Sequence, residues 1–254
     1  MFLFLHGIMG GMFKVKNLSV TVDGQEIIKG LTQDFTVPVG KFFVLFGPNG
    51  CGKSTLFRAC MGFSKYEVSG DILLEGKKIN GLKIDERVKS GLAYMYQNPP
   101  SLKGVKFEDV AKESVGDDLV WKEYSKDIDN LDARKFLKRD INVGLSGGEV
   151  KRSELLSLAM LENTKVFLFD EPDSGIDLDN LKKVGEYMGN LLKKKKAMGI
   201  IVTHSGDILK YIDAVKGAVM YRGKIACVGK PMEILECIKE HGYSKCVNCE
   251  EVKK

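Results

Sequence analysis

A glycine-rich segment of the chain has the composition of a phosphate-binding loop. Residues 47–55 read GPNGCGKST and lie between the apolar run KFFVLF and a segment of helical pattern. Glycines let successive main-chain amides converge on phosphate oxygens, and the start of a helix adds the positive end of its dipole. Lys53 is expected to reach the terminal phosphates of a bound nucleotide, and the Ser54 hydroxyl to hold Mg²⁺. The predicted nucleotide-binding residues here are Gly47, Pro48, Asn49, Gly50, Cys51, Gly52, Lys53, Ser54 and Thr55.

Two acidic residues follow a second apolar run. Residues 166–172 read VFLFDEP, so a run with the character of a buried strand delivers Asp170 and Glu171 to its carboxyl end. Asp170 is expected to ligand Mg²⁺ directly or through water. Glu171, displaced by one residue, is expected to orient and polarise an attacking water. A solvated strand end is the alternative interpretation, and the presence of the glycine-rich segment favours the catalytic one.

Two further predicted strand ends carry one polar side chain each. His204 closes the run IIVTH, where an imidazole can donate to a terminal phosphate. Gln97 lies in YMYQNPP, before two prolines that stop a helix from forming, and can contact Mg²⁺ or water. We assign catalytic roles to Lys53, Glu171 and His204, nucleotide contact to Gln97, and Mg²⁺ binding to Ser54, Gln97 and Asp170.

A second segment predicts another helix start. Residues 145–149 read LSGGE, and Ser146 and Glu149 have the spacing of a capping box around a helix that begins at Gly147. Such a helix N-terminus attracts phosphate. Because residues 47–55 already serve the chain's own nucleotide, this segment is expected to form half of a second site. Its residues are Leu145, Ser146, Gly147, Gly148 and Glu149.

Composition excludes several classes of protein. A chain of 254 residues with 44% apolar residues can build one substantial core. No apolar run approaches the roughly 20 residues that span a bilayer, and the first residues lack the basic region of a signal peptide. Six scattered cysteines favour a reducing cytoplasm over a disulfide scaffold. The net charge of +5 is mild and the lysines at 193–196 fall at a predicted helix end, so nucleic-acid binding is not expected.

Strand-like and helix-like patterns alternate along the chain, which predicts an α/β P-loop fold with a mixed sheet and an antiparallel β region. We expect strands at 13–22, 27–36, 41–46, 70–74, 92–96, 166–169, 199–203 and 218–221. We expect helices at 53–61, 147–161, 178–193, 207–211 and 232–241. Residues 100–143 are charge-rich, without a convincing strand, and predict a small inserted helical lobe. One domain, 1–254, thus comprises an extension (1–11), an α/β core (12–99 and 144–243), the lobe (100–143) and a tail (244–254).

The cysteines raise two further hypotheses. Cys237, His241, Cys246 and Cys249 follow the pattern C-x3-H-x4-C-x2-C, which could hold Zn²⁺ or an iron–sulfur cluster. An exposed tail without a metal is the favoured interpretation, because the first two residues can face different sides of their helix. Cys51 lies beside a helix N-terminus that should favour its thiolate. A small residue that fills space is favoured there over a redox role.

Together these motifs resemble the ATP-binding cassette (ABC) ATPases over residues 12–243. The resemblance implies that the chain hydrolyses ATP to ADP and phosphate with Mg²⁺, as an ATP-dependent head-to-tail homodimer. Each of two ATP molecules would lie between residues 47–55 of one subunit and residues 145–149 of the other. The same resemblance implies a loop that crosses between the subunits, formed by Ser174, Gly175, Ile176 and Asp177.

Four segments resemble one branch of that family, the SufC-type ATPase subunit of the SUF iron–sulfur cluster assembly system. They read SELLSLAML, DEPDSGIDLDNLK, IVTHSGDILKYI and GKIACVGKPMEILECIKEHGY. This resemblance implies a soluble scaffold partner of SufB or SufD type, with no nucleic acid and no insertion into a membrane. The alternative is the cytoplasmic ATP-binding subunit of an ABC membrane transporter, which would use the same ATP site.

Overall fold

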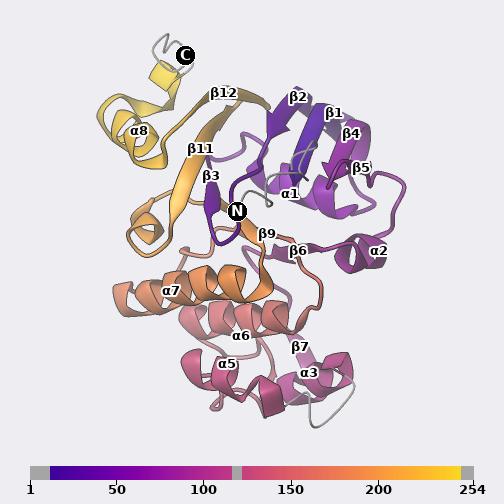
Figure 1. Cartoon of the computed structure of the whole chain (residues 1–254), viewed down its shortest axis with the longest axis vertical. Coiled ribbons are helices and arrows are strands. Elements are labelled where there is room, and N and C mark those ends of the chain that lie inside the picture. The colour runs from indigo at the N-terminus through magenta and orange to yellow at the C-terminus, as the bar shows by residue number, and fades with distance from the viewer. Residues whose placement is uncertain (1–11, 116–121, 247–254) are drawn as a thin grey trace, which may run out of the picture. The chain divides into compact units, whose positions relative to one another are not determined.

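The protein is described by a computed structural model that covers residues 12–115 and 122–246. The chain divides into two compact units. Figure 1 labels helices and strands of both. Among the described residues, unit 1 comprises 12–38, 42–90 and 214–246, and unit 2 comprises 39–41, 91–115 and 122–213. Each unit therefore combines segments that are distant in the sequence.

An antiparallel sheet with the strand order β2-β1-β4-β5 forms one part of unit 1. In β1 the buried residues are Phe13 and Val15, then Leu18 and Val20. The change from odd to even positions coincides with an irregularity in register between Val15 and Leu18, which returns the apolar side chains to the buried face. The strands are β1 (Phe13–Val22), β2 (Gln25–Asp34), β4 (Glu67–Leu74) and β5 (Lys77–Lys78).

The rest of unit 1 holds a second group of strands and three helices. Strand β11 pairs antiparallel with β12 and parallel with β3, so the predicted mixed sheet is confirmed. All five residues of β3 are buried, as expected for a strand covered on both faces. The bounds are β3 (Phe42–Phe46), β11 (Ala214–Tyr221), β12 (Lys224–Gly229), α1 (Lys53–Met61), α2 (Ile84–Lys89) and α8 (Pro231–Cys246).

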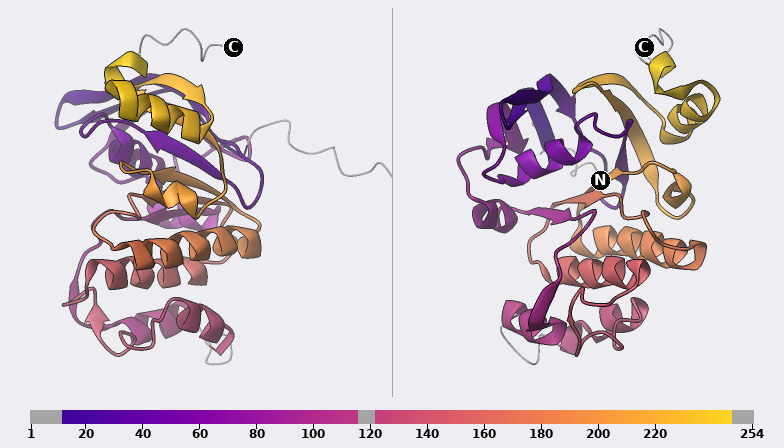
Figure 2. Two further views of the ribbon diagram at one scale, coloured as in Figure 1. Left: turned by 90° about the vertical axis from the view of Figure 1, so that its left-hand side faces the viewer. Right: turned by 180° about the vertical axis from the view of Figure 1, so that it is seen from behind.

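Unit 2 contains three parallel strands in the order β10-β9-β6. All three strands are buried along their whole length. Helices α6 and α7 lie side by side, as both views of Figure 2 show, and α6 also contacts β6. The bounds are β6 (Leu92–Met95), β9 (Val166–Asp170), β10 (Met198–Val202), α6 (Gly147–Met160) and α7 (Leu178–Lys195).

The segment between β6 and α6 contains both helices and strands. The sequence predicts no strand there, but the structure has a two-stranded antiparallel pair, β7 with β8. Every residue of β7 is exposed, so the strand lacks the alternation of apolar and polar residues that would reveal it. The Gly104 amide donates to Asp140 Oδ2 at 2.8 Å. The bounds are β7 (Leu102–Lys106), α3 (Phe107–Val115), α5 (Ser125–Asn130) and β8 (Asp140–Ile141).

Other differences from the sequence prediction concern the ends of elements. The segment predicted as a helix at 207–211 is a 3₁₀ helix, η1 (Asp207–Lys210). Helix α8 runs beyond the predicted end, through a non-helical Gly242 with φ 72° and ψ 173°. Strands β5 and β12 and helix α2 were not predicted. Within 12–115 and 122–246, no helix is both long enough and apolar enough to cross a membrane.

Candidate functional site

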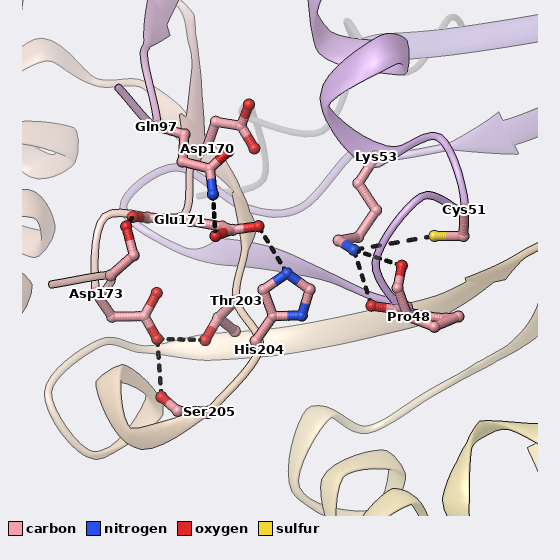
Figure 3. Close-up of polar contacts among 12 residues, drawn as sticks. Pro48, Cys51, Lys53, Gln97, Asp170, Glu171, Asp173, Thr203, His204 and Ser205 are labelled. Carbon is pink, nitrogen blue, oxygen red and sulfur yellow. Dashed lines mark hydrogen bonds and ion pairs between the residues drawn. The ribbon is translucent and has the colours of Figure 1, made fainter. Parts of the chain in front are cut away.

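Residues 47–52 of the glycine-rich segment lie between β3 and α1 in unit 1, and residues 53–55 begin α1, as predicted. Gly52 precedes the first turn of α1 with φ 109°, a conformation that side chains rarely adopt. A Cβ at Gly52 would also lie 3.0 Å from Met220 Cε. The Lys53 side chain is buried and its Nζ donates to Gly47 O at 2.8 Å and Pro48 O at 3.0 Å (Figure 3). The ammonium group is thus held over the loop by main-chain carbonyls.

Cys51 lies inside this loop and is 5% exposed. Burial raises the pKa of its thiol, and the nearby Lys53 ammonium only partly offsets that effect. The prediction that the helix N-terminus favours the thiolate is therefore wrong, because desolvation outweighs the positive charge. The burial of Cys51 agrees with a small residue that fills space in the loop, the interpretation that the sequence favours.

The carboxyl ends of the three parallel strands in unit 2 bring together Glu171, Gln97 and His204. Because β9 lies between β10 and β6, the residue after β9 has a neighbour on each side. Gln97 Nε2 donates to Glu171 Oε2 at 2.6 Å, and His204 Nε2 lies 2.6 Å from Glu171 Oε1 (Figure 3). Three side chains predicted separately from their strand ends thus form one hydrogen-bonded group.

The main chain of Glu171 is held in an unusual conformation. Its φ of 51° lies in the left-handed region, which a residue with a side chain adopts at a cost. The Glu171 amide donates to Val202 O at 3.1 Å. The Glu171 carbonyl accepts from the Ser174 amide at 3.1 Å and from Ser174 Oγ at 2.9 Å. These bonds fix the direction in which the Glu171 carboxylate points.

Asp170 is fully buried at the last position of β9. Tyr94 donates its hydroxyl proton to Asp170 Oδ2 at 2.8 Å, an interaction that was not predicted. The carboxylate of Asp170 and the amide oxygen of Gln97 are oxygen ligands of the kind that Mg²⁺ prefers. The chemistry of these two groups fits the predicted cation. In unit 1, Ser54 offers a hydroxyl oxygen.

A second acidic residue positions the segment that carries His204. Thr203 Oγ1 and Ser205 Oγ donate to Asp173 Oδ2 at 2.5 and 3.0 Å (Figure 3). Asp173 therefore holds the residues on both sides of His204. Asp173 was not predicted, although it follows Glu171 by two residues and two hydroxyl residues flank His204 in the sequence.

Residues 145–149 form the predicted capping box at the start of α6. The Glu149 amide donates to Ser146 Oγ at 3.3 Å, and the Ser146 amide donates to Glu149 Oε2 at 2.9 Å. That second bond and the Lys135 ammonium at 3.5 Å help to hold the pKa of Glu149 below its usual value. A Cβ at Gly147 would lie 2.3 Å from Gly175 O, so the helix start packs directly on the loop at 174–177.

Within that loop, Asp177 caps the start of α7. Its Oδ1 accepts from the Asn180 amide at 2.9 Å and its Oδ2 from Asn180 Nδ2 at 2.8 Å. These bonds hold the pKa of the exposed Asp177 below its usual value. The spacing Asp177 to Asn180 precedes an amphipathic helical pattern, so an N-cap could have been predicted from the sequence.

The cysteine-based metal site has no support in the part of the chain that the structure describes. Within it, no group of three or more His, Cys, Asp or Glu side chains could hold a metal ion. Cys237 and His241 lie on α8, and His241 Nδ1 is 3.6 Å from Glu240 Oε2. Cys249 and the side chain of Cys246 lie outside the described residues.

Comparisons with known proteins extend over both units. The family model for ABC transporters matches residues 32–174. Vegetative protein 296 of Bacillus subtilis (strain 168) is 35% identical, over 90% of each chain. A probable ABC transporter ATP-binding protein of Streptococcus pyogenes serotype M18 is 36% identical, over 92% of this chain and 94% of the relative. The structure of cbiO1 from Clostridium perfringens, part of the ABC transporter complex cbiONQ, is 26% identical, with a TM-score of 0.71 and 94% coverage of both chains.

Proposed function

Since the chain belongs to the ABC transporter family and is an ATPase, we propose that it works as an ATP-dependent head-to-tail homodimer whose closure moves a partner protein. The observation that carries this proposal is the Glu171 carboxylate held between Gln97 and His204. A carboxylate with a fixed direction and two hydrogen-bonded neighbours is suited to hold a water molecule for attack on a phosphate. Hydrolysis would then reopen the dimer.

Each predicted site residue takes a role in this proposal. Lys53 and the amides of residues 47–55 bind the phosphates of ATP. Ser54, Gln97 and Asp170 hold Mg²⁺, which neutralises phosphate charge when bound. Glu171 accepts a proton from the attacking water, and His204 donates to the terminal phosphate.

The start of α6 is proposed to bind the nucleotide of the second subunit. Its capping box leaves the first turn of a helix directed at an approaching phosphate. Gly147 packs against Gly175 without room for a Cβ, so the start of α6 and the loop at 174–177 are in direct contact. This packing supports a shared role for the two segments in the dimer interface.

The substitution Glu171→Gln tests the dimer. It keeps the shape of the side chain but removes the proton acceptor, so ATP hydrolysis should fall about 10³-fold. With ATP and Mg²⁺ the variant should elute as a dimer in size-exclusion chromatography with light scattering, and without ATP as a monomer. The exposed Glu162 provides the control, since Glu162→Gln should hydrolyse ATP like the parent. A monomer under all conditions would contradict the proposal.

One candidate partner is a membrane permease. The streptococcal relative is named as a probable ABC transporter ATP-binding protein, and cbiO1 is part of an ABC transporter complex. In this case the chain is the ATP-binding subunit of a transporter. These names favour the permease over the second candidate.

The second candidate partner is a soluble iron–sulfur scaffold of SufB or SufD type. It is supported by the resemblance of the four segments that begin at residues 153, 170, 201 and 223. In this case ATP-driven closure changes the conformation of the scaffold. The same ATP site serves both candidates, so the partner and not the chemistry distinguishes them.

Isolation of the native complex without oxygen, followed by identification of the co-purifying chains, distinguishes the two partners. An integral membrane protein recovered in stoichiometric amount supports the permease and excludes the scaffold. A soluble chain that carries iron and sulfide gives the opposite result. Glu171→Gln with ATP should strengthen either association, since it holds the dimer closed.

A further inference from the structure

Two charged residues of α6 form hydrogen bonds with the main chain that follows β6. Lys151 Nζ donates to Gln97 O at 2.7 Å and to Tyr96 O at 3.3 Å. Glu154 Oε1 accepts from the Tyr96 amide at 3.2 Å. Lys151 and Glu154 are three residues apart and so lie on one face of the helix. Three polar main-chain groups of two consecutive residues are thus bonded to a single helix.

Both charged side chains that make these contacts are largely shielded from water. Lys151 is 3% exposed, and burial lowers its pKa although the carboxylates of Glu154, Asp170 and Glu171 favour its charged form. Glu154 Oε2 is shielded from solvent and has no hydrogen-bond partner among the described residues. A buried pair of charged side chains often stabilises a fold no more than apolar side chains of similar volume. Stability alone therefore does not account for this pair.

The position of the pair connects two parts of the site. Lys151 lies two residues after Glu149, in the first turns of the helix whose start is proposed to bind the partner's nucleotide. The Gln97 side chain bonds directly to Glu171 at 2.6 Å. A continuous path of contacts thus runs from the start of α6 through Lys151 to the main chain of Gln97, and from the Gln97 side chain to Glu171.

We propose that Lys151 and Glu154 are positioning residues that fix the Tyr96–Gln97 main chain to α6, so that a displacement of residues 145–149 changes how Gln97 holds Glu171. A helix moves as a rigid element, and the bonds to the main chain carry its displacement to the segment that bears Gln97. The inference rests on the proposed function, because that displacement is assigned to the partner's ATP. The contacts of Lys151 and Glu154 would thus couple the two nucleotide sites of the dimer, because in each subunit α6 begins at one site and Glu171 belongs to the other.

The first test is a comparison of Lys151→Met with Lys195→Met. Lys195 Nζ also donates to a main-chain carbonyl, Leu161 O at 2.8 Å, but at the other end of α6. Lys151→Met should lower kcat for ATP about 10- to 100-fold with KM within about threefold, because a misplaced catalytic group affects turnover more than binding. Lys195→Met should leave both constants within about threefold of the parent. Equal effects of the two substitutions would overturn the proposal.

Rescue by a conservative variant separates positioning from simple structural damage. Lys151→Arg keeps a donor for both carbonyls and should recover most of the lost kcat. Glu154→Gln keeps an acceptor for the Tyr96 amide and should lower kcat less than Lys151→Met. Thermal unfolding of each variant reports whether it is folded. If Lys151→Arg is folded and no more active than Lys151→Met, the bonds to the carbonyls do not position the site.

A double-mutant cycle tests whether Lys151 acts through Gln97. If it does, Lys151→Met combined with Gln97→Ala should be no slower than Gln97→Ala alone, because the side chain that Lys151 positions is already absent. Effects of the two substitutions that multiply would show that Lys151 acts by another route and would overturn the proposal.

The last measurement separates this inference from the proposed function. In the Glu171→Gln background, Lys151→Met should still form the ATP-dependent dimer, since residues 47–55 and 145–149 are unchanged. If Glu171→Gln alone fails to dimerise, the proposed function fails. If Glu171→Gln dimerises while Lys151→Met hydrolyses ATP at the parent rate, only the coupling is overturned.

Discussion

Two groups of residues are built in different ways. The glycine loop of unit 1 consists of residues 47–55, and the acidic edge of unit 2 consists of Gln97, Glu171 and His204. In the loop, nine consecutive residues supply the whole group, and Lys53 bonds to carbonyls only five and six positions away. At the acidic edge, Glu171 bonds to Gln97 and His204, which are 74 and 33 positions away. The first group depends on local main-chain geometry, and the second on the order of strands in a sheet.

The two groups are suited to different steps, the glycine loop to binding the nucleotide and the acidic edge to its hydrolysis. The loop offers main-chain amides and one ammonium, which recognise phosphate but do not move a proton. The acidic edge offers a carboxylate, an imidazole and an amide, which can orient water and accept a proton. Substitutions in the loop should therefore affect nucleotide affinity, and substitutions at the edge should affect the rate after binding.

After Glu171→Gln, the largest effect is expected from Lys53→Met. Removal of the ammonium that stabilises phosphate charge should lower kcat/KM for ATP about 10²- to 10³-fold and weaken ATP binding as well. Steady-state hydrolysis and equilibrium binding of a fluorescent ATP analogue measure the two effects. Lys65→Met is the control, since Lys65 is an exposed lysine paired with Asp23 at 3.0 Å. If Lys53→Met still binds ATP like the parent, the loop does not determine the affinity for ATP.

A smaller and more selective effect is expected from His204→Ala. Loss of the imidazole should lower kcat about 10- to 100-fold, since Glu171 loses one of its two hydrogen-bond partners. ATP binding should stay within about threefold of the parent, because the glycine loop is intact. His241→Ala is the matched control on α8. A fall in affinity as large as the fall in kcat would remove the distinction between the two groups.

Gly147→Ala tests the packing between residues 145–149 and the loop at 174–177. A Cβ at Gly147 meets Gly175 O at 2.3 Å, so one main chain must shift. We expect ATP hydrolysis to fall about tenfold through misplacement of the helix start, with weaker ATP-dependent dimerisation in the Glu171→Gln background. A Cβ at Gly189, in α7, meets nothing within 4 Å, so Gly189→Ala should be silent or stabilising. Normal activity of Gly147→Ala would show that the contact is dispensable.

The sequence predicted the local parts of this molecule well. The bounds of α1 are those expected from the glycine loop that precedes it, and the capping box of Ser146 and Glu149 forms as its spacing requires. Both follow from residues within a few positions of one another. The strand ends with Asp170, Gln97 and His204 were also expected, since apolar runs mark buried strands.

Long-range neighbours could not be predicted in the same way. Nothing in the runs at 92–96, 166–169 and 199–203 specifies that β9 lies between the other two strands, so the contacts of Glu171 were not predicted. Lys151 and Glu154 were missed because charged residues on a helix usually face solvent. The β7–β8 pair was missed because its exposed residues give no periodic signal.

The smallest effect, a dependence of stability on pH, distinguishes two glutamates of α6. Burial raises the pKa of Glu154 to about 7, helped by the charge of Asp170 and opposed by the Tyr96 amide and Lys151. Between the ordinary value of 4.5 and about 7, the native state holds a proton that the unfolded state has lost, so this group lowers stability as pH rises. Glu154→Gln should remove that slope, which is on the order of 1 kcal/mol per pH unit, in urea unfolding between about pH 5 and pH 8.

Glu149, five residues earlier on the same helix, should behave in the opposite way. The Ser146 amide holds its pKa below 4.5, so its contribution to stability is present throughout the range above that value and is lost only as pH falls below it. The cost of Glu149→Gln should therefore be constant between about pH 5 and pH 8, while the cost of Glu154→Gln changes sign or size over the same interval. Parallel pH profiles for the two variants would show that Glu154 is ionised in the folded protein, with Lys151 close enough to neutralise it.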